Sequence, residues 1–273
     1  MKKWNILFFI FFGGLIYSYG QSEQQPNFEI DGTINADSCK IHLVFDSDYM
    51  PDKTKELTAE VKDKKFFISG YIPESQGVFI VLDNHYMSSN FVIEKGAQAI
   101  FINVDSARKV PLVKNRVMLE EYPNFRAFHK EIEMRNELFS QKNDSLQKLY
   151  NNNLPESINL ILKQEQRILY DAGDSTLLKY TKKHTNSKFA FWRLIYLMHW
   201  GYEPIYDSIY NSFSETLKNG YAGKILKDKL QNSRQLSVGN MFPYFDCENS
   251  NGENLSSDIF LRNKFTLVDF WYS

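Results

Sequence analysis

The stretch FEIDGTI, residues 28–34, places Phe28, Ile30, Gly32 and Ile34 at alternate positions between polar side chains. This period of two is typical of a β-strand with one buried face. The alternation returns at residues 41–45 and 57–61, and further apolar groups follow at 66–68, 78–82, 91–93 and 99–104. Seven short strands at a spacing of roughly 8–12 residues predict an antiparallel β-sandwich or open barrel over residues 26–113.

The next part of the chain, residues 116–234, has a helical period. Apolar side chains recur at steps of three and four along residues 125–149, and a second stripe follows Pro155, which suits the first turn of a helix. The group Gly173-Asp174-Ser175 predicts a break with a new N-cap. Residues 189–200 are apolar almost all round, as expected of a buried helix. Together with two further amphipathic stretches, these segments predict a helical domain of about five helices.

Residues 1–20 have the pattern of a secretory signal peptide. Lys2 and Lys3 precede a mostly apolar run of 14 residues, and Ser18 and Gly20 place small residues before a cleavage site at Gln21. The run is shorter than the about 20 apolar residues that span a membrane, although an uncleaved anchor is the alternative interpretation. We therefore expect cleavage between Gly20 and Gln21, export to the periplasm or cell envelope, and no membrane span afterwards.

The charges are nearly balanced over the whole chain but not along it. The 32 Lys and Arg residues oppose 33 Asp and Glu residues, for a net charge of −1. Residues 21–113 carry a net charge of −5 and residues 114–234 a net charge of +5. The basic side chains of the second region are not clustered, so the sequence argues against a nucleic-acid partner.

The last segment, residues 235–273, changes character again. It contains a Gly-x-x-x-Pro-x-Phe entry, an Asn-Gly hairpin turn, a Leu-Ser step and a dense apolar strand, carried by Gly239, Pro243, Phe245, Asn251, Gly252, Leu255, Ser256, Lys264 and residues 267–271. In this order and spacing, these residues resemble the opening of a thioredoxin-like domain of the TlpA/ResA and AhpC/TSA superfamily. The β-rich region, with Phe28, Ile30 and Gly32 at its start, is similar to a domain of unknown function found ahead of such domains in envelope proteins.

The resemblance implies a thiol–disulfide oxidoreductase, in which a Cys-x-x-Cys pair attacks and resolves a substrate disulfide. Asp269, Phe270, Trp271 and Ser273 match family-motif positions beside that active site, and the two cysteines would begin just after Ser273. The sequence as given ends before them, so residues 235–273 are expected to form an incomplete thioredoxin-like fragment. We expect the chain to be inactive in thiol–disulfide exchange, and we assign no catalytic residue.

Other candidate sites are weak. Cys39 and Cys247 are the two cysteines, and a disulfide between them is permitted in an oxidising compartment, but two unpaired thiols are favoured. His129 with Glu131 and Glu133 suggests a metal site, for which a solvated helix face is the better interpretation. Asp171 and Asp174 lack the spacing of a calcium loop, and Trp192 and Trp200 are expected in the core. The sequence therefore predicts no metal and no cofactor.

Two functions remain open from the sequence. The first is an exported thioredoxin-like oxidoreductase that contributes to redox homeostasis and acts on protein disulfides. The alternative is a non-catalytic envelope module whose β-rich and helical domains bind a partner. The fold expected for both is a multidomain α+β chain.

Overall fold

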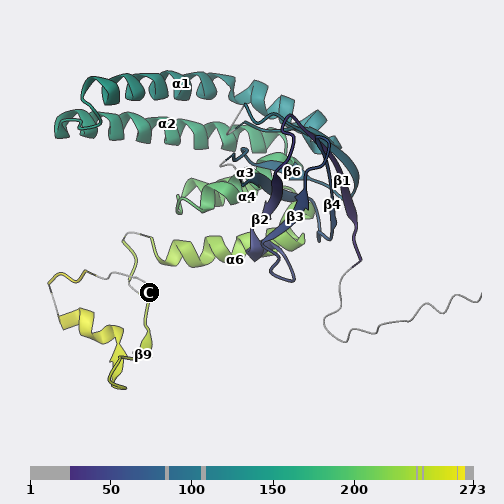
Figure 1. Cartoon of the computed structure of the whole chain (residues 1–273). Helices are drawn as coiled ribbons and strands as arrows, with labels where there is room; N and C mark the ends of the chain where they lie inside the picture. The colour runs from purple at the N-terminus through teal and green to yellow at the C-terminus, as the bar shows by residue number, and fades with distance from the viewer. Residues whose placement is uncertain are drawn as a thin grey trace, which may run out of the picture.

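A computed structural model describes residues 25–83, 86–105, 109–237, 239–241, 243–262 and 264–267. The predicted signal peptide with Gly20 and Gln21, and the motif residues Asp269, Phe270, Trp271 and Ser273, lie outside these residues. The described chain begins with two β-sheets, continues through a set of helices and reaches a short hairpin that is followed by a 3₁₀ helix (Figure 1). It is a mixed α+β structure.

The first sheet has the strand order β4-β1-β7-β8, and the second has the order β3-β2-β5-β6. The strands are β1 (Phe28–Ile34), β2 (Lys40–Phe45), β3 (Glu56–Glu60), β4 (Lys65–Gly70), β5 (Gln76–Leu82), β6 (Phe91–Ile93), β7 (Gly96–Ile102) and β8 (Leu112–Lys114). Every second residue of β1 is buried, as the alternation predicts. Gly32 belongs to this buried row because a Cβ at that position would overlap the ring of Phe66.

One strand pair differs from the expected antiparallel arrangement. β1 runs parallel to β7, whereas the other pairs in both sheets are antiparallel. The chain passes through the second sheet before β4 and again before β7, and it thus returns to the free edge of β1 in the same direction as β1. The eighth strand, β8, has only three residues, which is too short for an alternation to be recognised in the sequence.

Two long helices follow the sheets. A π-helical turn (Val117–Glu121) leads into α1 (Tyr122–Leu149), and α2 (Glu156–Lys183) returns beside it, so that the two form an antiparallel hairpin (Figure 1). The predicted break at Gly173-Asp174-Ser175 is wrong, because α2 continues through it. Gly173 faces Ile132 across the helix pair, and this packing outweighs the weak helix propensity of glycine. None of the described helices is long and apolar enough to cross a membrane.

The remaining helices are α3 (Lys188–Met198), α4 (Ile205–Ser212), α5 (Glu215–Lys218) and α6 (Tyr221–Gln235). α3 matches the segment that was predicted to be buried, and the side chain of Ser187 caps its N-terminus by accepting the amide of Ala190 at 3.2 Å. α4 begins after Pro204 and is separated from α5 because Phe213 and Ser214 adopt extended backbone conformations.

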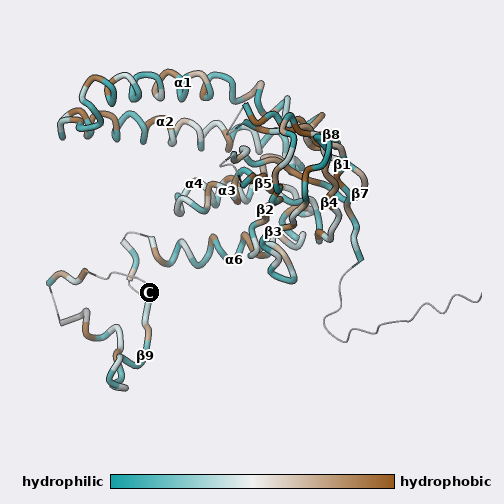
Figure 2. Tube along the Cα trace, viewed as in Figure 1, coloured by the Kyte–Doolittle hydropathy of each residue, from teal (hydrophilic) through white to brown (hydrophobic). Residues whose placement is uncertain are grey.

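The sheets and the helices share one hydrophobic core. Figure 2 shows hydrophobic positions concentrated in the strands and in α3, and also spaced along α1 and α2. The indole Nε1 of Trp192 on α3 donates to the carbonyl of Ser75, just before β5, at 2.8 Å. A Cβ on Gly77 of β5 would lie only 2.7 Å from the Trp192 ring. The regions predicted as separate β-rich and helical domains are therefore packed together.

The C-terminal segment contains the hairpin that the Asn-Gly pair predicts. β9 (Asp246–Glu248) pairs antiparallel with β10 (Asn254–Ser256), and Gly252 in the turn has a φ of +79°. The side-chain oxygen of Asn249 accepts the amides of Asn251 and Glu253. A 3₁₀ helix (Ser257–Arg262) follows the hairpin. Residues 264–267 have no regular structure, so the predicted strand is not seen in its described part.

Two glycine substitutions test this packing. We expect Gly77→Ala to lower the free energy of unfolding by about 1–3 kcal/mol, because the added methyl group forces the Trp192 ring from its place.

Gly173→Ala should instead raise the free energy of unfolding by about 0.5–1 kcal/mol, because alanine favours a continuous helix and the new Cβ meets only ordinary contact distances. Urea unfolding measures both. A neutral Gly77→Ala would contradict the close approach of α3, and a destabilising Gly173→Ala would contradict the continuous helix.

Candidate functional site

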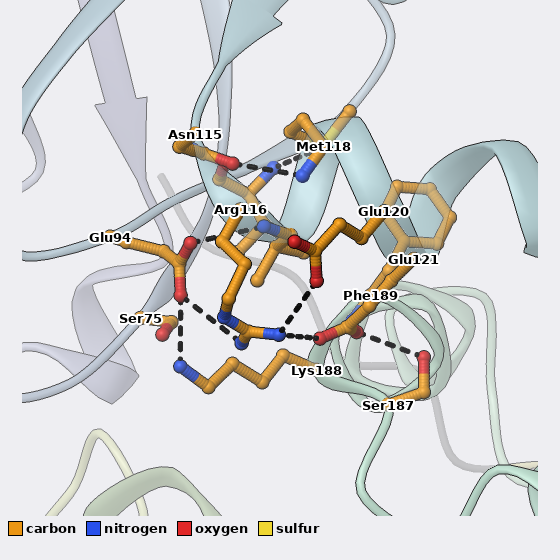
Figure 3. Close-up of polar contacts among 12 residues, drawn as sticks. Ser75, Glu94, Asn115, Arg116, Met118, Glu120, Glu121, Ser187, Lys188 and Phe189 are labelled. Atoms are coloured by element: carbon orange, nitrogen blue, oxygen red, sulfur yellow. Dashed lines mark hydrogen bonds and ion pairs between the residues drawn. The ribbon is translucent and has the colours of Figure 1, made fainter.

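A groove of about 570 Å³ lies where the sheets meet α3 and α5. Its apolar wall consists of Phe191, Trp192 and Leu217. The charged residues that line it are Glu74, Glu94, Lys95, Arg116 and Lys188. Figure 3 shows the polar contacts at its base, where side chains from the β6–β7 turn, from the segment after β8 and from α3 meet.

Glu94 is the centre of these contacts. Its Oε1 lies 3.0 Å from Nζ of Lys188 and 3.5 Å from Nη2 of Arg116, and its Oε2 accepts the amide of Val117 at 3.0 Å (Figure 3). Burial acts to raise the pKa of the Glu94 carboxyl, but Lys188, the Val117 amide and Arg116 together outweigh it. The pKa of Glu94 therefore lies below its ordinary value, and the carboxylate is charged at neutral pH.

Arg116 extends the cluster to a second carboxylate. Its Nη1 lies 3.3 Å from Oε1 of Glu121, and the other oxygen of Glu121 accepts from Ser187 Oγ and from the amide of Phe189, each at 3.1 Å. The amide of Phe189 is one of the free N–H groups at the start of α3. Glu121 therefore holds the N-terminus of α3 from outside that helix, where a negative charge is favourable.

The wall behind Glu94 is held by buried amide side chains. The side chain of Gln98 bonds to both the amide and the carbonyl of Glu94, and Asn115 donates to Gln98 and to the carbonyl of Val92. Asn115 also accepts the amide of Met118 at 2.8 Å. These bonds fix the backbone of the β6–β7 turn, and so they fix the position of the Glu94 carboxylate.

A second set of contacts joins the loop after β2 to the helices. Asp46 lies 3.1 Å from Nε2 of His199, and Asp48 lies 2.7 Å from Nζ of Lys229. The same Lys229 ammonium lies over the ring of buried Tyr49. The hydrogen bond to Asp46 raises the pKa of His199. This second set, like the first, joins residues that are far apart in the sequence.

The arrangement suits binding better than catalysis. The Glu94 and Glu121 carboxylates are both engaged by cations and amides, and the pKa of Glu94 is lowered, whereas a general acid needs a raised pKa. No cysteine lines the groove. A charged rim beside an aromatic wall is what a polypeptide segment with mixed side chains would require.

The cysteines are not brought together as a redox pair. In the described part of the chain, Cys39 is half-buried just before β2, Cys247 is exposed on β9, and both are free. Burial, followed by the charges of Asp83 and Glu60, raises the pKa of the Cys39 thiol. A raised pKa opposes formation of the reactive thiolate.

The histidine and acidic candidates also have structural roles. His129 is buried on α1, where its Nδ1 contacts the carbonyl of Phe125 at 2.9 Å and its ring stacks on that residue. Burial lowers the pKa of His129, and the Glu133 carboxylate pairs with Arg126. Within the described residues, no group of three His, Cys, Asp or Glu side chains is placed to hold a metal ion.

The tryptophans and aspartates divide between core and surface. Trp192 is in the core as predicted, but the prediction for Trp200 is wrong, because 79% of its surface is exposed just beyond the end of α3. Asp171 pairs with Arg167 on the surface of α2. Asp174 is buried, and burial, with Glu203 nearby, raises its pKa to about 6.

The residues of the groove could not be recognised in the sequence. Glu94, Arg116 and Lys188 belong to no motif, and Glu94 and Lys188 are 94 positions apart. Glu94 directly follows β6 and is followed by the turn-forming pair Lys95-Gly96, in which Gly96 has a φ of +91°.

The ion cluster predicts a specific cost for neutralising Glu94. We expect Glu94→Gln to lower the free energy of unfolding at pH 7 by about 1–3 kcal/mol, because Lys188 and Arg116 lose a charged partner. The folded pKa is depressed, so the stabilisation is present at neutral pH and is lost as the pH falls below about 4. Glu120→Gln is the matched control, since Glu120 is 68% exposed and 3.8 Å from Arg116. Equal effects of the two substitutions in urea unfolding would contradict this cluster.

Asp174 predicts the opposite dependence on pH. Its folded pKa of about 6 lies above the value of about 3.9 in an unfolded chain, so the folded state binds the proton more tightly. The cost of the charged carboxylate is therefore complete above about pH 6, and stability recovers as the pH falls from about 6 to about 4. We expect Asp174→Asn to raise the free energy of unfolding by about 1–2 kcal/mol at pH 7.5 and by about half as much at pH 5. Asp171→Asn is the control, and a gain that is equal at both pH values would refute the prediction.

Comparison with known proteins places a family match on the sheets. Residues 28–118 match the model of a domain of unknown function (DUF4369). Searches of curated proteins and of solved structures gave no match. The match covers about a third of the chain, contains all eight strands of the two sheets, and ends at Met118, the second residue of the π-helical turn. The groove therefore combines Glu94 and Arg116 of this domain with Lys188 and Trp192 from the helices beyond it, and the first part of the chain contains a DUF4369 domain.

Proposed function

We propose that residues 28–235 form a non-catalytic binding module of an exported, thioredoxin-like thiol–disulfide oxidoreductase. The observation that carries the non-catalytic part of this proposal is that the two cysteines are free and far apart. Thiol–disulfide exchange requires an accessible thiolate with a resolving thiol nearby. The described residues contain only Cys39, with a raised pKa, and the distant Cys247, both free.

The thioredoxin-like assignment rests on the resemblance of residues 235–273. The β9–β10 hairpin and the 3₁₀ helix after it support that proposal, because they have the order of elements that the resemblance implies. The Cys-x-x-Cys pair that would run the reaction is not found in the 273 residues. The signal-peptide pattern of residues 1–20 supports a site of action in the periplasm or cell envelope.

The groove supports the binding half of the proposal. Its aromatic wall can receive an apolar side chain, and Lys95, Arg116 and Glu74 on its rim can pair with charged neighbours of that side chain. A segment of a protein substrate has this mixed chemistry. The module would thus hold a polypeptide near a redox domain without reacting with it.

Insulin and its isolated B chain test the lack of catalysis and the binding of a polypeptide, respectively. We expect residues 21–273 to give no acceleration of insulin reduction in a dithiothreitol-coupled assay, and the Cys39→Ser/Cys247→Ser variant to behave in the same way. Carboxymethylated insulin B chain, which has no thiols, should bind weakly and saturably, as measured by isothermal calorimetry.

Two tyrosine substitutions test whether the B chain binds in the groove. Thr216→Tyr fills the groove from an exposed position and should weaken B-chain binding at least tenfold, whereas Asn211→Tyr on the surface of α4 should not. Catalysis that survives loss of both cysteines would refute the non-catalytic module. B-chain binding that is absent, or insensitive to Thr216→Tyr, would refute the groove as its site.

A further inference from the structure

The α1–α2 hairpin extends beyond the shared core (Figure 1). The buried residues of α1 are Phe125 and His129, both in its first turns, so the remaining length of α1 packs mainly on α2. Five large aliphatic side chains on this extended part are 52–70% exposed. Leu160 lies about 100° around α2 from Ile161, and the other four are Leu138, Leu149, Ile161 and Ile168. Exposed apolar residues are ordinary when they are scattered, so their relative placement decides their meaning.

The four side chains share one face of the hairpin. At about 100° per residue, Leu138 and Leu149 are within about 20° of each other around α1, and Ile161 and Ile168 are equally close around α2. Nζ of Lys142 lies 2.6 Å from Oε1 of Glu165, which joins the two helices across this same side. Lys142 follows Leu138 by one turn, and Glu165 lies between the two isoleucines. The salt bridge therefore crosses the face that carries the aliphatic side chains.

This face is turned away from the rest of the molecule. Thr181 on α2 contacts α4, since its Oγ1 lies 2.6 Å from Oγ of Ser212. Ile161 is twenty residues earlier and thus about 160° around the helix from Thr181. The face that carries Ile161 and Ile168 points nearly opposite to α4, and it is open in the single chain.

We propose that a second copy of this chain covers the face, so that two hairpins form an antiparallel four-helix bundle around a twofold axis parallel to the helices. Such an axis places α1 of one copy against α2 of the other, with Leu138 near Ile168 and Leu149 near Ile161. It also places Lys142 of each copy near Glu165 of the other. The face is thus complementary to itself in both apolar contact and charge, as a twofold interface requires.

The available area agrees with a dimer of modest affinity. Residues 131–149 of α1 are about 28 Å long, and two helices side by side are about 20 Å wide, which gives about 560 Å² per copy. Two copies would bury about 1,100 Å², just above the roughly 1,000 Å² expected of a specific interface. We therefore expect a reversible dimer rather than a permanent one.

Sedimentation velocity of residues 21–273 from 1 to 200 μM tests the proposal. We expect a monomer–dimer equilibrium that Leu138→Glu/Ile168→Glu weakens at least tenfold, because four charges would enter an apolar contact. Tyr170→Glu is the control, since Tyr170 is also exposed but lies about 180° around α2 from Ile161. Circular dichroism confirms that each variant retains its helices.

A charge exchange tests the geometry independently. Lys142→Glu and Glu165→Lys should each weaken self-association, and an equimolar mixture of the two variants should form a heterodimer. A chain that stays monomeric at 200 μM would overturn the proposal. A dimer that tolerates the Leu138/Ile168 double variant, that is equally weakened by Tyr170→Glu, or that is not recovered in the mixture would overturn it as well.

Discussion

The structure depends on how closely α3 approaches β5. Gly77 leaves the backbone of β5 bare, so the ring of Trp192 can lie directly on it, and the indole N–H is satisfied by the carbonyl of Ser75. Because the contact involves backbone and not only side chains, α3 becomes part of the core of the sheets. A helix that is apolar on nearly all sides needs such an environment, with sheet on one side and helices on the others. The chain therefore folds its strands and helices as one packed body.

Two carboxylates that lie outside α3 and α6 cap the N-termini of these helices and so tie them to the sheets. Glu121 accepts the amide of Phe189 at the start of α3, and Glu74, in the turn before β5, accepts the amides of Tyr221 and Ala222 at the start of α6. The first residues of a helix leave amides without partners inside the helix. Gly220 has no side chain to cap α6, so Glu74 takes that role across the interface. The N-terminus of α6 is thus completed only when the helices are docked on the sheets.

The features that could be predicted from the sequence are those that depend on near neighbours. The alternation of Phe28–Ile34 predicts both a strand and its buried face, and Asn251-Gly252 predicts a hairpin turn. The parallel pairing of β1 with β7 depends on the path of the chain through another sheet, which no local pattern records. Gly173 shows the same limit, because its weak local propensity is overruled by packing against Ile132. The groove was missed for this reason, since Glu94 and Lys188 meet only in the folded chain.

The groove is formed by the sheets and the helices together. The DUF4369 match ends at Met118, so it includes Glu94 and Arg116 but neither Lys188 nor the aromatic wall of the groove. Without α3, the Glu94 carboxylate would lose Lys188, its closest cation, and Trp192 would no longer cover Gly77. The matched domain supplies the charged side of the groove, while the helices supply its apolar side. A function located in this groove therefore belongs to the combined sheet–helix body, and other chains with a DUF4369 domain would share it only where similar helices complete the wall.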